Sequence, residues 1–368
     1  MQRILQIVST MDYGGAETLL MSIYRKIDRT KLQFDFLCLN RTESKFFEEI
    51  HSLGGRMFKV DSPRYVGIRQ YCQQLYRFFI EHPEYRIVHA HLNRDSAFSL
   101  WMAKCAGVPN RISHSHVANV PYSVHYRLYT SVAKFINNRC LTDRFACSED
   151  AGKYLFGSKV SFHLMPNAID TEKFTFDENR RMLIRNRMKL VEGQILIGHV
   201  GRFSPEKNHV FLLRLFAELA YREAKCRLVL LGGGGLEQAI RRQVEELGIT
   251  DKVIFAGLQS DTSSYYAAMD LFLFPSIFEG LGIVAIEAQC AGLPVIASTM
   301  VPKFAKVTDL MEFVSLGETL DTWCDIILKH LSSLPANRKS YALEVARSPY
   351  NVDNIVEFLQ NYYLNLSN

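Results

Sequence analysis

Apolar runs and helical patterns alternate along the whole chain, and this alternation starts a second time near residue 195. The first series opens with an apolar run at Arg3–Ser9, followed by helical spacing at Ala16–Ile27. The second opens with Ile195–Val200, followed by a helical pattern at His209–Tyr221. Strands that alternate with helices predict right-handed crossovers and a parallel sheet. The sequence therefore predicts an α/β protein with two Rossmann-like domains.

The length of the chain supports two domains. Its 368 residues exceed the roughly 250–300 residues at which single cores stop growing. We expect an N-terminal domain at 1–170 and a C-terminal domain at 171–351, which face each other across a cleft at the carboxyl ends of their strands. The polar stretch Thr171–Arg187 is the expected linker. An amphipathic pattern at Val352–Leu366 predicts a closing helix that can pack back on the first domain.

Composition and charge restrict the environment of the protein. No apolar run approaches the roughly 18 residues that span a bilayer, and the first apolar run is too short for a secretory signal. Eight scattered cysteines form no CxxC pair, which favours reduced thiols and a cytoplasmic location. Residues 1–170 hold 22 of the 43 Lys and Arg and 15 of the 38 Asp and Glu, so this half carries +7. An anionic partner suits that half, but no nucleic-acid motif accompanies it.

The strongest candidate site is the segment Pro275–Ala288, PSIFEGLGIVAIEA. An apolar strand ends in a loop with Glu279, and a helix begins near Gly282. The free N–H groups and the dipole of a helix start suit a phosphate. Glu287 then lies about one turn into the helix, where it can reach ligand hydroxyls, and its apolar neighbours require a polar partner for it. The alternative is a solvated glutamate on a helix face.

A second candidate site is the segment Gly201–His209, GRFSPEKNH, between a strand and a helix. Arg202 and Lys207 converge there on the carboxyl end of the strand. Two cations suit a diphosphate, because arginine binds it as a fork and lysine as a point charge. The alternative is a charged surface loop in which Glu206 pairs with Lys207.

Two glycine-rich turns are weaker candidates. Gly14 and Gly15 follow the first strand and permit a tight turn at a helix start, which can cradle an anion or a sugar. Gly232–Gly235 also joins a strand to a helix. This second run is not GxGxxG and lacks the acidic residue of a dinucleotide site, so we do not expect NAD to bind.

Histidines occur in two pairs, His89 with His91 and His114 with His116. Each pair lies at the carboxyl end of a strand, where residues i and i+2 share a face. Zinc is conceivable, but no carboxylate or cysteine ligand accompanies the histidines. We expect one histidine of each pair to line the cleft and the other to be packed. The sequence has no Asp-x-Asp motif, so we expect no metal and no cofactor.

The stretch Pro121–Asn138 is basic and aromatic, and Arg139 and Arg144 follow it. Such a helix can rest on an anionic membrane surface, so residues 121–144 are a candidate membrane contact. The alternative is a partly buried helix whose basic side chains extend to solvent. The aromatic and basic residues concerned are Tyr122, Tyr126, Arg127, Tyr129, Lys134 and Phe135.

Taken together and in order, these motifs resemble those of retaining GT-B glycosyltransferases of family 4, especially the bacterial capsular and exopolysaccharide type. The resemblance covers nearly the whole chain, and the ordered set is far more specific than any single motif. The Glu279–Glu287 pair resembles the family's E-x7-E motif. The other matching segments are Gly14–Glu17, Val88–His91, Arg111–His116, Pro166–Asp170 and Gly201–Asn208.

The resemblance implies roles for individual residues. Arg202 and Lys207 would hold the donor diphosphate, and Glu279 would bind hydroxyls of the donor sugar. The amides of Gly280 and Leu281 would add donor contacts, and Glu287 would bind the ribose. The remaining implied roles are those of His116 at the reacting centre, Gly15 near phosphate or acceptor, and Gly14 and His91 on the acceptor side.

The resemblance also implies the reaction. A hexose or N-acetylhexosamine would move from a nucleotide-diphosphate sugar, with UDP as the expected nucleotide, to a lipid-linked glycan at the inner membrane face. No metal or cofactor would take part. One alternative is a UDP-sugar 2-epimerase of the same fold, which needs no acceptor site. The other is a glycan-binding scaffold without activity.

Overall fold

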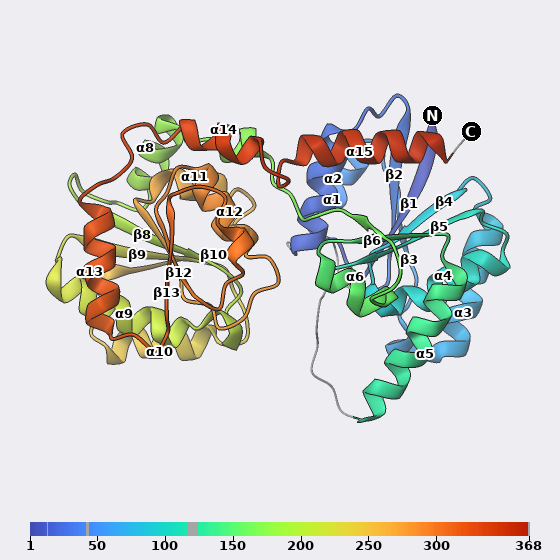
Figure 1. Cartoon of the computed structure of the whole chain (residues 1–368), viewed down its shortest axis with the longest axis horizontal. Helices are drawn as coiled ribbons and strands as arrows, with labels where there is room; N and C mark the ends of the chain where they lie inside the picture. The colour runs from blue at the N-terminus through green and yellow to red at the C-terminus, as the bar shows by residue number, and fades with distance from the viewer. Residues whose placement is uncertain (13, 42–43, 117–123, 367–368) are drawn as a thin grey trace. The chain divides into compact units, whose positions relative to one another are not determined.

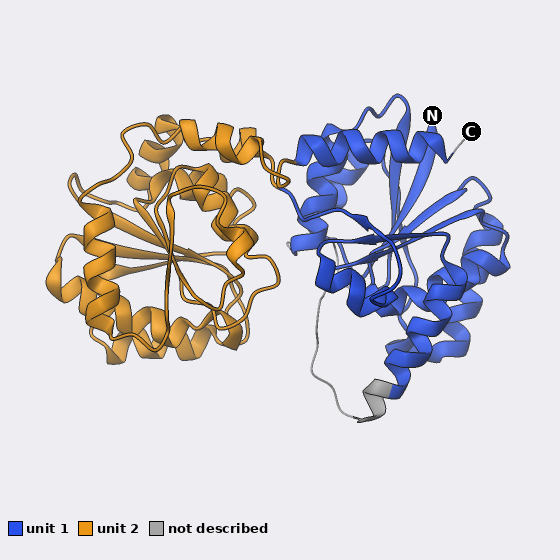
Figure 2. Ribbon diagram, in the orientation of Figure 1, with its two compact units in different colours: residues 1–168, 352–368 blue, residues 169–351 orange. Residues whose placement is uncertain are grey.

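The chain divides into two compact units, shown in Figure 2. Unit 1 comprises Met1–Ala168 and Val352–Asn368, and unit 2 comprises Ile169–Asn351. The computed structural model describes residues 1–12, 14–41, 44–116 and 124–366, and for residues 124–127 the backbone alone. Each unit encloses its own apolar cores, on the two faces of a parallel sheet.

The described part of unit 1 contains a seven-stranded parallel sheet with the order β3-β2-β1-β4-β5-β6-β7. Helices α1, α2 and α15 cover one face, and α3, α4 and α6 cover the other (Figure 1). The strands are β1 (Gln2–Val8), β2 (Leu32–Cys38), β3 (Met57–Lys59), β4 (Ile87–Ala90), β5 (Asn110–Ser115), β6 (Asp143–Ala146) and β7 (His163–Leu164). The helices are α1 (Gly15–Lys26), α2 (Phe47–Ser52), α3 (Pro63–Glu81), α4 (Ser96–Cys105), α5 (Val124–Cys140), α6 (Glu149–Phe156) and α15 (Val352–Asn365).

Unit 2 is built on six parallel strands, all of them within the described residues, in the order β10-β9-β8-β11-β12-β13. The strands are β8 (Ile195–Val200), β9 (Cys226–Leu231), β10 (Val253–Gly257), β11 (Leu271–Phe274), β12 (Val295–Ser298) and β13 (Met311–Val314). The helices are α7 (Thr171–Phe174), α8 (Glu178–Arg187), α9 (His209–Arg222), α10 (Glu237–Glu246), α11 (Ser263–Ala268), α12 (Ile283–Cys290), α13 (Leu320–Leu331) and α14 (Ser340–Ala346). The predicted fold class, an α/β protein with two Rossmann-like parallel sheets, is confirmed.

In each sheet the strand order reverses once, and ligands of open α/β sheets bind outside the strand ends at such a switch point. In unit 1 the switch point lies between β1 and β4, and in unit 2 between β8 and β11. The loops that carry Gly14, His91, His116, Arg202 and Glu279 leave these four strands and β5. Each unit therefore gathers its candidate residues at the edge of its own sheet where a ligand is expected.

Helix α15 belongs to unit 1, although it follows unit 2 in the sequence (Figure 1). Its apolar residues Ile355, Leu359 and Tyr363 enter the same core as α1 and β2. Lys26 of α1 also pairs with Asp353 at 2.8 Å. This helix therefore completes the core on the face of the sheet that carries the histidines.

The expected linker at Thr171–Arg187 is wrong. This stretch forms α7 and α8, whose first turns are capped by the side chains of Asp170 and Asp177. Arg181 and Arg185 of α8 bind the buried Asp270 carboxylate at 2.6 and 3.1 Å. Polar composition suggested a linker, but the charges are used to dock a helix against the sheet of unit 2.

Within the described residues, no helix combines the length and the apolar composition needed to cross a membrane.

Candidate active site

The loops after β8 and β11 are bonded to each other at the switch point of unit 2. The Ile277 amide donates to the Glu206 carbonyl at 2.9 Å, and the Asn208 side chain donates to the Pro275 carbonyl at 3.1 Å. A 3₁₀ turn at Pro205–Lys207 lifts Lys207 toward the second loop. The two strongest candidate segments of the sequence therefore form one site.

Lys207 and Glu279 form an ion pair in this site. The Lys207 Nζ atom lies 2.5 Å from Glu279 Oε1, and the two side chains are 17% and 10% exposed. Lys207 therefore does not pair with Glu206, which was the alternative that the sequence left open. An ammonium has three donors, so Lys207 can bind Glu279 and still present hydrogens to an anion.

Arg202 is exposed, and its side chain forms no hydrogen bond or ion pair with the described residues. The loop that carries it packs on the glycine run after β9. A Cβ atom added at Gly232 would lie 2.0 Å from the Gly201 carbonyl oxygen. A Cβ atom added at Gly234 would lie 2.6 Å from the Phe203 carbonyl oxygen, so packing against the Arg202 loop explains Gly232 and Gly234, which the sequence alone did not reveal.

Helix α12 begins where the sequence predicts, with Gly282 as its N-cap at φ 79°. Its first turn contains no acidic side chain, and its N-cap residue is a glycine, which has no side chain that could cap the free amides. The Ala285 amide donates to the Gly282 carbonyl at 2.9 Å, whereas the amides of Gly280, Leu281, Ile283 and Val284 follow Glu279 directly in the sequence. A helix start without an internal cap can bind an anion.

Glu287 projects from α12 and finds the polar partner that its apolar surroundings require. The Tyr266 hydroxyl donates to Glu287 Oε2 at 2.9 Å. Removal from water raises the pKa of Glu287 to about 7, although the Tyr266 hydrogen bond and Lys173 act in the opposite direction. This carboxyl group therefore titrates near neutral pH, and Tyr266 is a site residue that sequence reasoning missed.

Unit 1 has a cavity of about 880 Å³ at its own switch point. Its lining combines aromatic rings with Arg94, Asp95, His91 and His116. Gly14 and Gly15 lie at the start of α1 beside this lining, and a Cβ atom added at Gly15 would meet nothing within 4 Å. The protein itself therefore does not require a glycine at position 15, which leaves room for a ligand to approach the backbone there.

The four histidines share one face of β4 and β5. His89 and His114 are buried in the core, as the sequence predicts for one member of each pair, and His91 and His116 line the cavity of unit 1. Burial lowers the pKa of His89 to about 3 and that of His116 to about 4, and lowers those of His91 and His114 well below the usual value. All four imidazoles are therefore neutral at neutral pH.

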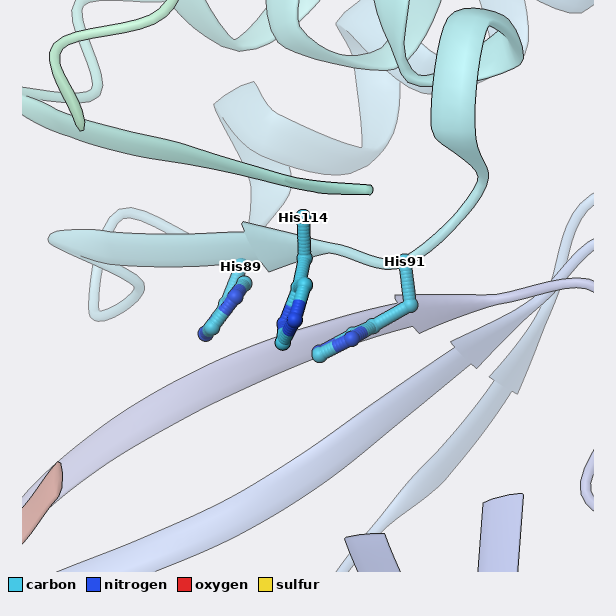
Figure 3. A group of neighbouring side chains, drawn as sticks. All are labelled: His89, His91 and His114. Atoms are coloured by element: carbon cyan, nitrogen blue, oxygen red, sulfur yellow. The ribbon is translucent and has the colours of Figure 1, made fainter. Parts of the chain in front are cut away.

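Three of these histidines lie close enough to be considered as metal ligands. Ligand atoms of His89, His91 and His114 lie within 4.8 Å of one another (Figure 3). However, the rings of His89 and His91 are stacked at an interplanar angle of 25°, and those of His89 and His114 at 19°. A metal ion binds a ring nitrogen that has no other partner, and both nitrogens of His91 are already engaged, by Gln6 and by His116. The group is therefore arranged as a packed stack, which does not fit a metal.

From residue 124 onward, the basic, aromatic stretch forms α5. Tyr122 lies outside the described residues, as do the side chains of Tyr126 and Arg127. Lys134 lies over the ring of Tyr154 at 3.6 Å, and Tyr129 donates to Asp95 at 2.9 Å. Among the side chains of α5 that the structure describes, the large apolar ones that are exposed are Leu128, Val132 and Phe135.

Comparison with known proteins identifies the family. The family model for glycosyl transferases group 1 matches residues 181–310. The "Putative glycosyltransferase EpsF" of Bacillus subtilis (strain 168) is 33% identical over 371 residues, which cover 98% of this chain and 96% of that protein. The UDP-Gal:alpha-D-GlcNAc-diphosphoundecaprenol alpha-1,3-galactosyltransferase of Escherichia coli is 26% identical over 231 residues, or 59% of this chain and 58% of that protein.

Solved structures agree on the fold. HepE of Anabaena in complex with UDP-glucose superimposes with a TM-score of 0.79 over 99% of this chain and 100% of that chain, at 19% identity. The relative in Bacillus subtilis matches nearly the whole chain, and the family model matches the larger part of unit 2. The chain belongs to the glycosyl transferases group 1 family.

Proposed function

We propose that the protein transfers a hexose or N-acetylhexosamine from a UDP-sugar to a lipid-linked glycan, with retention of configuration at the anomeric carbon. The observation that carries this proposal is the joining of Lys207, Glu279 and the start of α12 at one switch point. HepE binds UDP-glucose, and the galactosyltransferase of Escherichia coli acts on a diphosphoundecaprenol-linked sugar. Both names support a nucleotide sugar and a lipid-linked acceptor for this protein.

Unit 2 binds the donor in this proposal. Negative charge develops on the leaving diphosphate during transfer. Arg202, Lys207 and the first amides of α12 stabilise this charge, so that no metal ion is needed. Glu279 keeps its contact with Lys207 through Oε1, and its other oxygen accepts a hydrogen bond from a hydroxyl of the donor sugar. Glu287 accepts hydroxyls of the ribose, and Gly280 and Leu281 add backbone contacts.

Unit 1 binds the acceptor in this proposal. The cavity beside Gly14, Gly15 and His91 offers aromatic rings for a sugar face, together with Arg94 and Asp95 for its hydroxyls. His116, in the same lining, contacts the reacting sugar. The cavity of unit 1 offers a separate site for an acceptor. This favours transfer over isomerisation of the donor, because isomerisation needs no acceptor.

A donor panel tests the proposal. The protein is incubated with UDP-, GDP- and ADP-sugars, with and without lipid-linked acceptor, in EDTA and in Mg²⁺, and release of nucleoside diphosphate is followed. We expect release from a UDP-sugar only with acceptor, equally in EDTA, and an α-linked product from an α-linked donor by NMR. Acceptor-independent conversion of the donor sugar would identify an epimerase, and binding of UDP without turnover would identify a scaffold.

A peripheral position on the inner membrane face is part of the same proposal. Leu128, Val132 and Phe135 follow one another at helical spacing on α5, and the Arg139 guanidinium lies over the Phe135 ring at 4.6 Å. Apolar side chains flanked by arginine suit an anionic lipid surface. We expect co-sedimentation with phosphatidylglycerol vesicles and not with phosphatidylcholine vesicles, and loss of binding in the Phe135→Glu variant. Equal binding to both vesicles would contradict this position.

A further inference from the structure

A groove follows helix α3 away from the cavity of unit 1. A second cavity, of about 420 Å³, lies between α3 and the ends of β2 and β3, and Asn40 lines both this cavity and the first. A third cavity, of about 500 Å³, lies along α3 and shares Gln74 and Arg77 with the second. The shared residues join the three cavities end to end. We refer to the second and third cavities together as the α3 groove.

The junction between the cavity and the α3 groove is held by a network of side chains. The Arg41 guanidinium donates to both oxygens of the Asp61 carboxylate, at 2.7 and 3.0 Å, and both residues line the groove. The same guanidinium lies over the Tyr65 ring at 4.8 Å, and Tyr65 lines the cavity of unit 1. A pair with two parallel hydrogen bonds fixes the geometry of both partners. The passage from the cavity to the groove therefore has a defined shape.

Basic side chains outnumber acidic ones in the α3 groove. The charged residues that line it are Arg41, Lys59, Asp61, Arg69, Arg77 and Glu81. Arg41 and Asp61 neutralise each other. The side chains of Lys59, Arg69 and Arg77 are exposed, and with the described residues they form no hydrogen bond or ion pair. A ligand in the groove therefore meets an excess of positive charge, in the half of the chain for which the sequence predicts an anionic partner.

Three glutamines accompany the arginines of the third cavity. Gln70, Gln73 and Gln74 line it, and Val66 is the one apolar residue among the described residues of the lining. Their side-chain amides form no hydrogen bond with any other described residue. A carboxamide both donates and accepts hydrogen bonds, which suits the neighbouring hydroxyls of a sugar ring. The lining thus combines groups for hydroxyls with groups for negative charge.

A membrane surface is the other anionic partner to consider, but the lining of the α3 groove does not favour it. Contact with a bilayer places apolar side chains in the acyl boundary and basic ones beside them. The large apolar side chains that α3 exposes are Tyr65, Ile68, Tyr76 and Ile80, and none of them lines the groove. The two cavities of the groove, at about 420 and 500 Å³, also have the size of ligand sites.

We propose that the α3 groove binds an acidic segment of the acceptor glycan. Sugars beyond the one in the cavity of unit 1 extend along α3, where Lys59, Arg69 and Arg77 bind carboxylates or other acidic substituents and the glutamines bind ring hydroxyls. The proposal rests on the proposed function, which places the acceptor in that cavity, and it adds the chemical class of the acceptor, a negatively charged oligosaccharide. Because the groove is separate from the reacting sugar, it contributes to affinity and not to the chemical step.

The test measures the binding of two oligosaccharides that differ in charge. Hexagalacturonate carries a carboxylate on each sugar, and its methyl ester has the same sugars without the charges. Calorimetric titration of the full chain with each probe needs neither donor nor turnover. We expect hexagalacturonate to bind at least ~10-fold more tightly than its methyl ester at low salt, and the difference to decrease as ionic strength rises. Equal affinities for the two probes, or no binding of either, would overturn the proposal.

A double variant locates the binding. Arg69→Gln/Arg77→Gln removes two charges from the α3 groove, and the substitutions are combined because single exposed ion pairs are weak, so we expect the Kd for hexagalacturonate to rise ~10-fold. The matched control is Arg86→Gln/Lys159→Gln, which removes the same charge from exposed positions of unit 1 that do not line the groove. It should change the Kd by less than ~2-fold. An equal rise in both double variants would assign the binding to overall charge and contradict the proposal.

Two further comparisons separate this proposal from a membrane contact and from the proposed function. The same variants are sedimented with phosphatidylglycerol vesicles, and we expect Arg69→Gln/Arg77→Gln to bind them as the control does. Loss of vesicle binding in that variant, together with equal affinities for the two oligosaccharides, would assign the groove to a lipid surface. If the donor panel gives no transfer while hexagalacturonate binds as expected, the proposed function alone fails. If transfer occurs and the two oligosaccharides bind equally, the role of the α3 groove alone fails.

Discussion

The two switch points of the molecule have the same topology and different side-chain chemistry. Between β8 and β11, unit 2 places the Lys207–Glu279 ion pair before the start of a helix, and Arg202 lies on the same loop as Lys207. Between β1 and β4, unit 1 lines a cavity with aromatic rings and the imidazoles of His91 and His116, together with Arg94 and Asp95. In the proposed function, the same strand arrangement serves two kinds of ligand. Cations suit a diphosphate, whose negative charge increases during transfer, and aromatic rings with hydrogen-bonding side chains suit a sugar.

The largest expected effect tests whether charge is what distinguishes the site of unit 2. Lys207→Ala and Arg202→Ala should each lower the transfer rate at least ~10-fold, because a hydrogen bond to a charged group contributes ~1.5–3 kcal/mol and 1.36 kcal/mol is a factor of ten. The measurement is kcat/KM with the preferred donor. Lys225→Ala, at an exposed lysine before β9, is the control and should leave the rate unchanged. Near-normal rates in both site variants would remove the charged site from the mechanism.

The second prediction concerns pH, where the two units should differ. The pKa of Glu287 is raised to about 7, so its carboxylate forms as pH rises through that value. Ionised carboxylates accept stronger hydrogen bonds, so affinity for UDP-glucose should increase ~10-fold between pH 6 and pH 8. Calorimetric titration at each pH measures this change. The histidines of unit 1 have lowered pKa values and should contribute nothing in this range.

Glu287→Gln is the variant that decides this second prediction. A glutamine cannot titrate, so its affinity for UDP-glucose should stay constant between pH 6 and pH 8. A slope equal to that of the wild type would assign the pH dependence to another group. UDP-glucose is the suitable probe, because its diphosphate, unlike that of UDP, has no ionisation near neutral pH.

The smallest expected effect concerns the open backbone of unit 1. A methyl group at Gly15 meets no protein atom within 4 Å, so Gly15→Ala should leave the unfolding midpoint unchanged. If the acceptor approaches this turn, the added methyl group should occupy part of its space and lower kcat/KM for the acceptor ~3-fold. Gly235→Ala of unit 2 has equally open surroundings and serves as the control. Unchanged acceptor kinetics in Gly15→Ala would mean that the acceptor does not contact the start of α1.

Much of this organisation could be predicted from the sequence. Apolar runs that alternate with helical patterns marked most strands, and the start of α12 at Gly282 followed from local signals alone. The predicted linker was wrong because the partner of Arg181 and Arg185 is Asp270, more than 80 residues away. Local composition carries no information about such a partner.

The same reason explains which site residues were missed. Arg202, Lys207, Glu279 and Glu287 could be selected because their motifs are contiguous. Tyr266 matters only through a carboxylate 21 residues away, and Gln6 only through imidazoles on other strands and a hydroxyl 357 residues away. Nothing in the neighbouring sequence of either residue indicates such a contact.

The position of α15 also has a consequence for synthesis on the ribosome. Unit 2 is one continuous segment and can fold as soon as residues 169–351 have emerged. Unit 1 cannot, because its core lacks Ile355, Leu359 and Tyr363 until the final helix is made. The segment translated first is therefore the one completed last, and until α15 is made only α1 and α2 cover the face of its sheet that carries the histidines. A nascent chain halted before residue 352 would present that face to chaperones and proteases, whereas unit 2 beside it would already be folded.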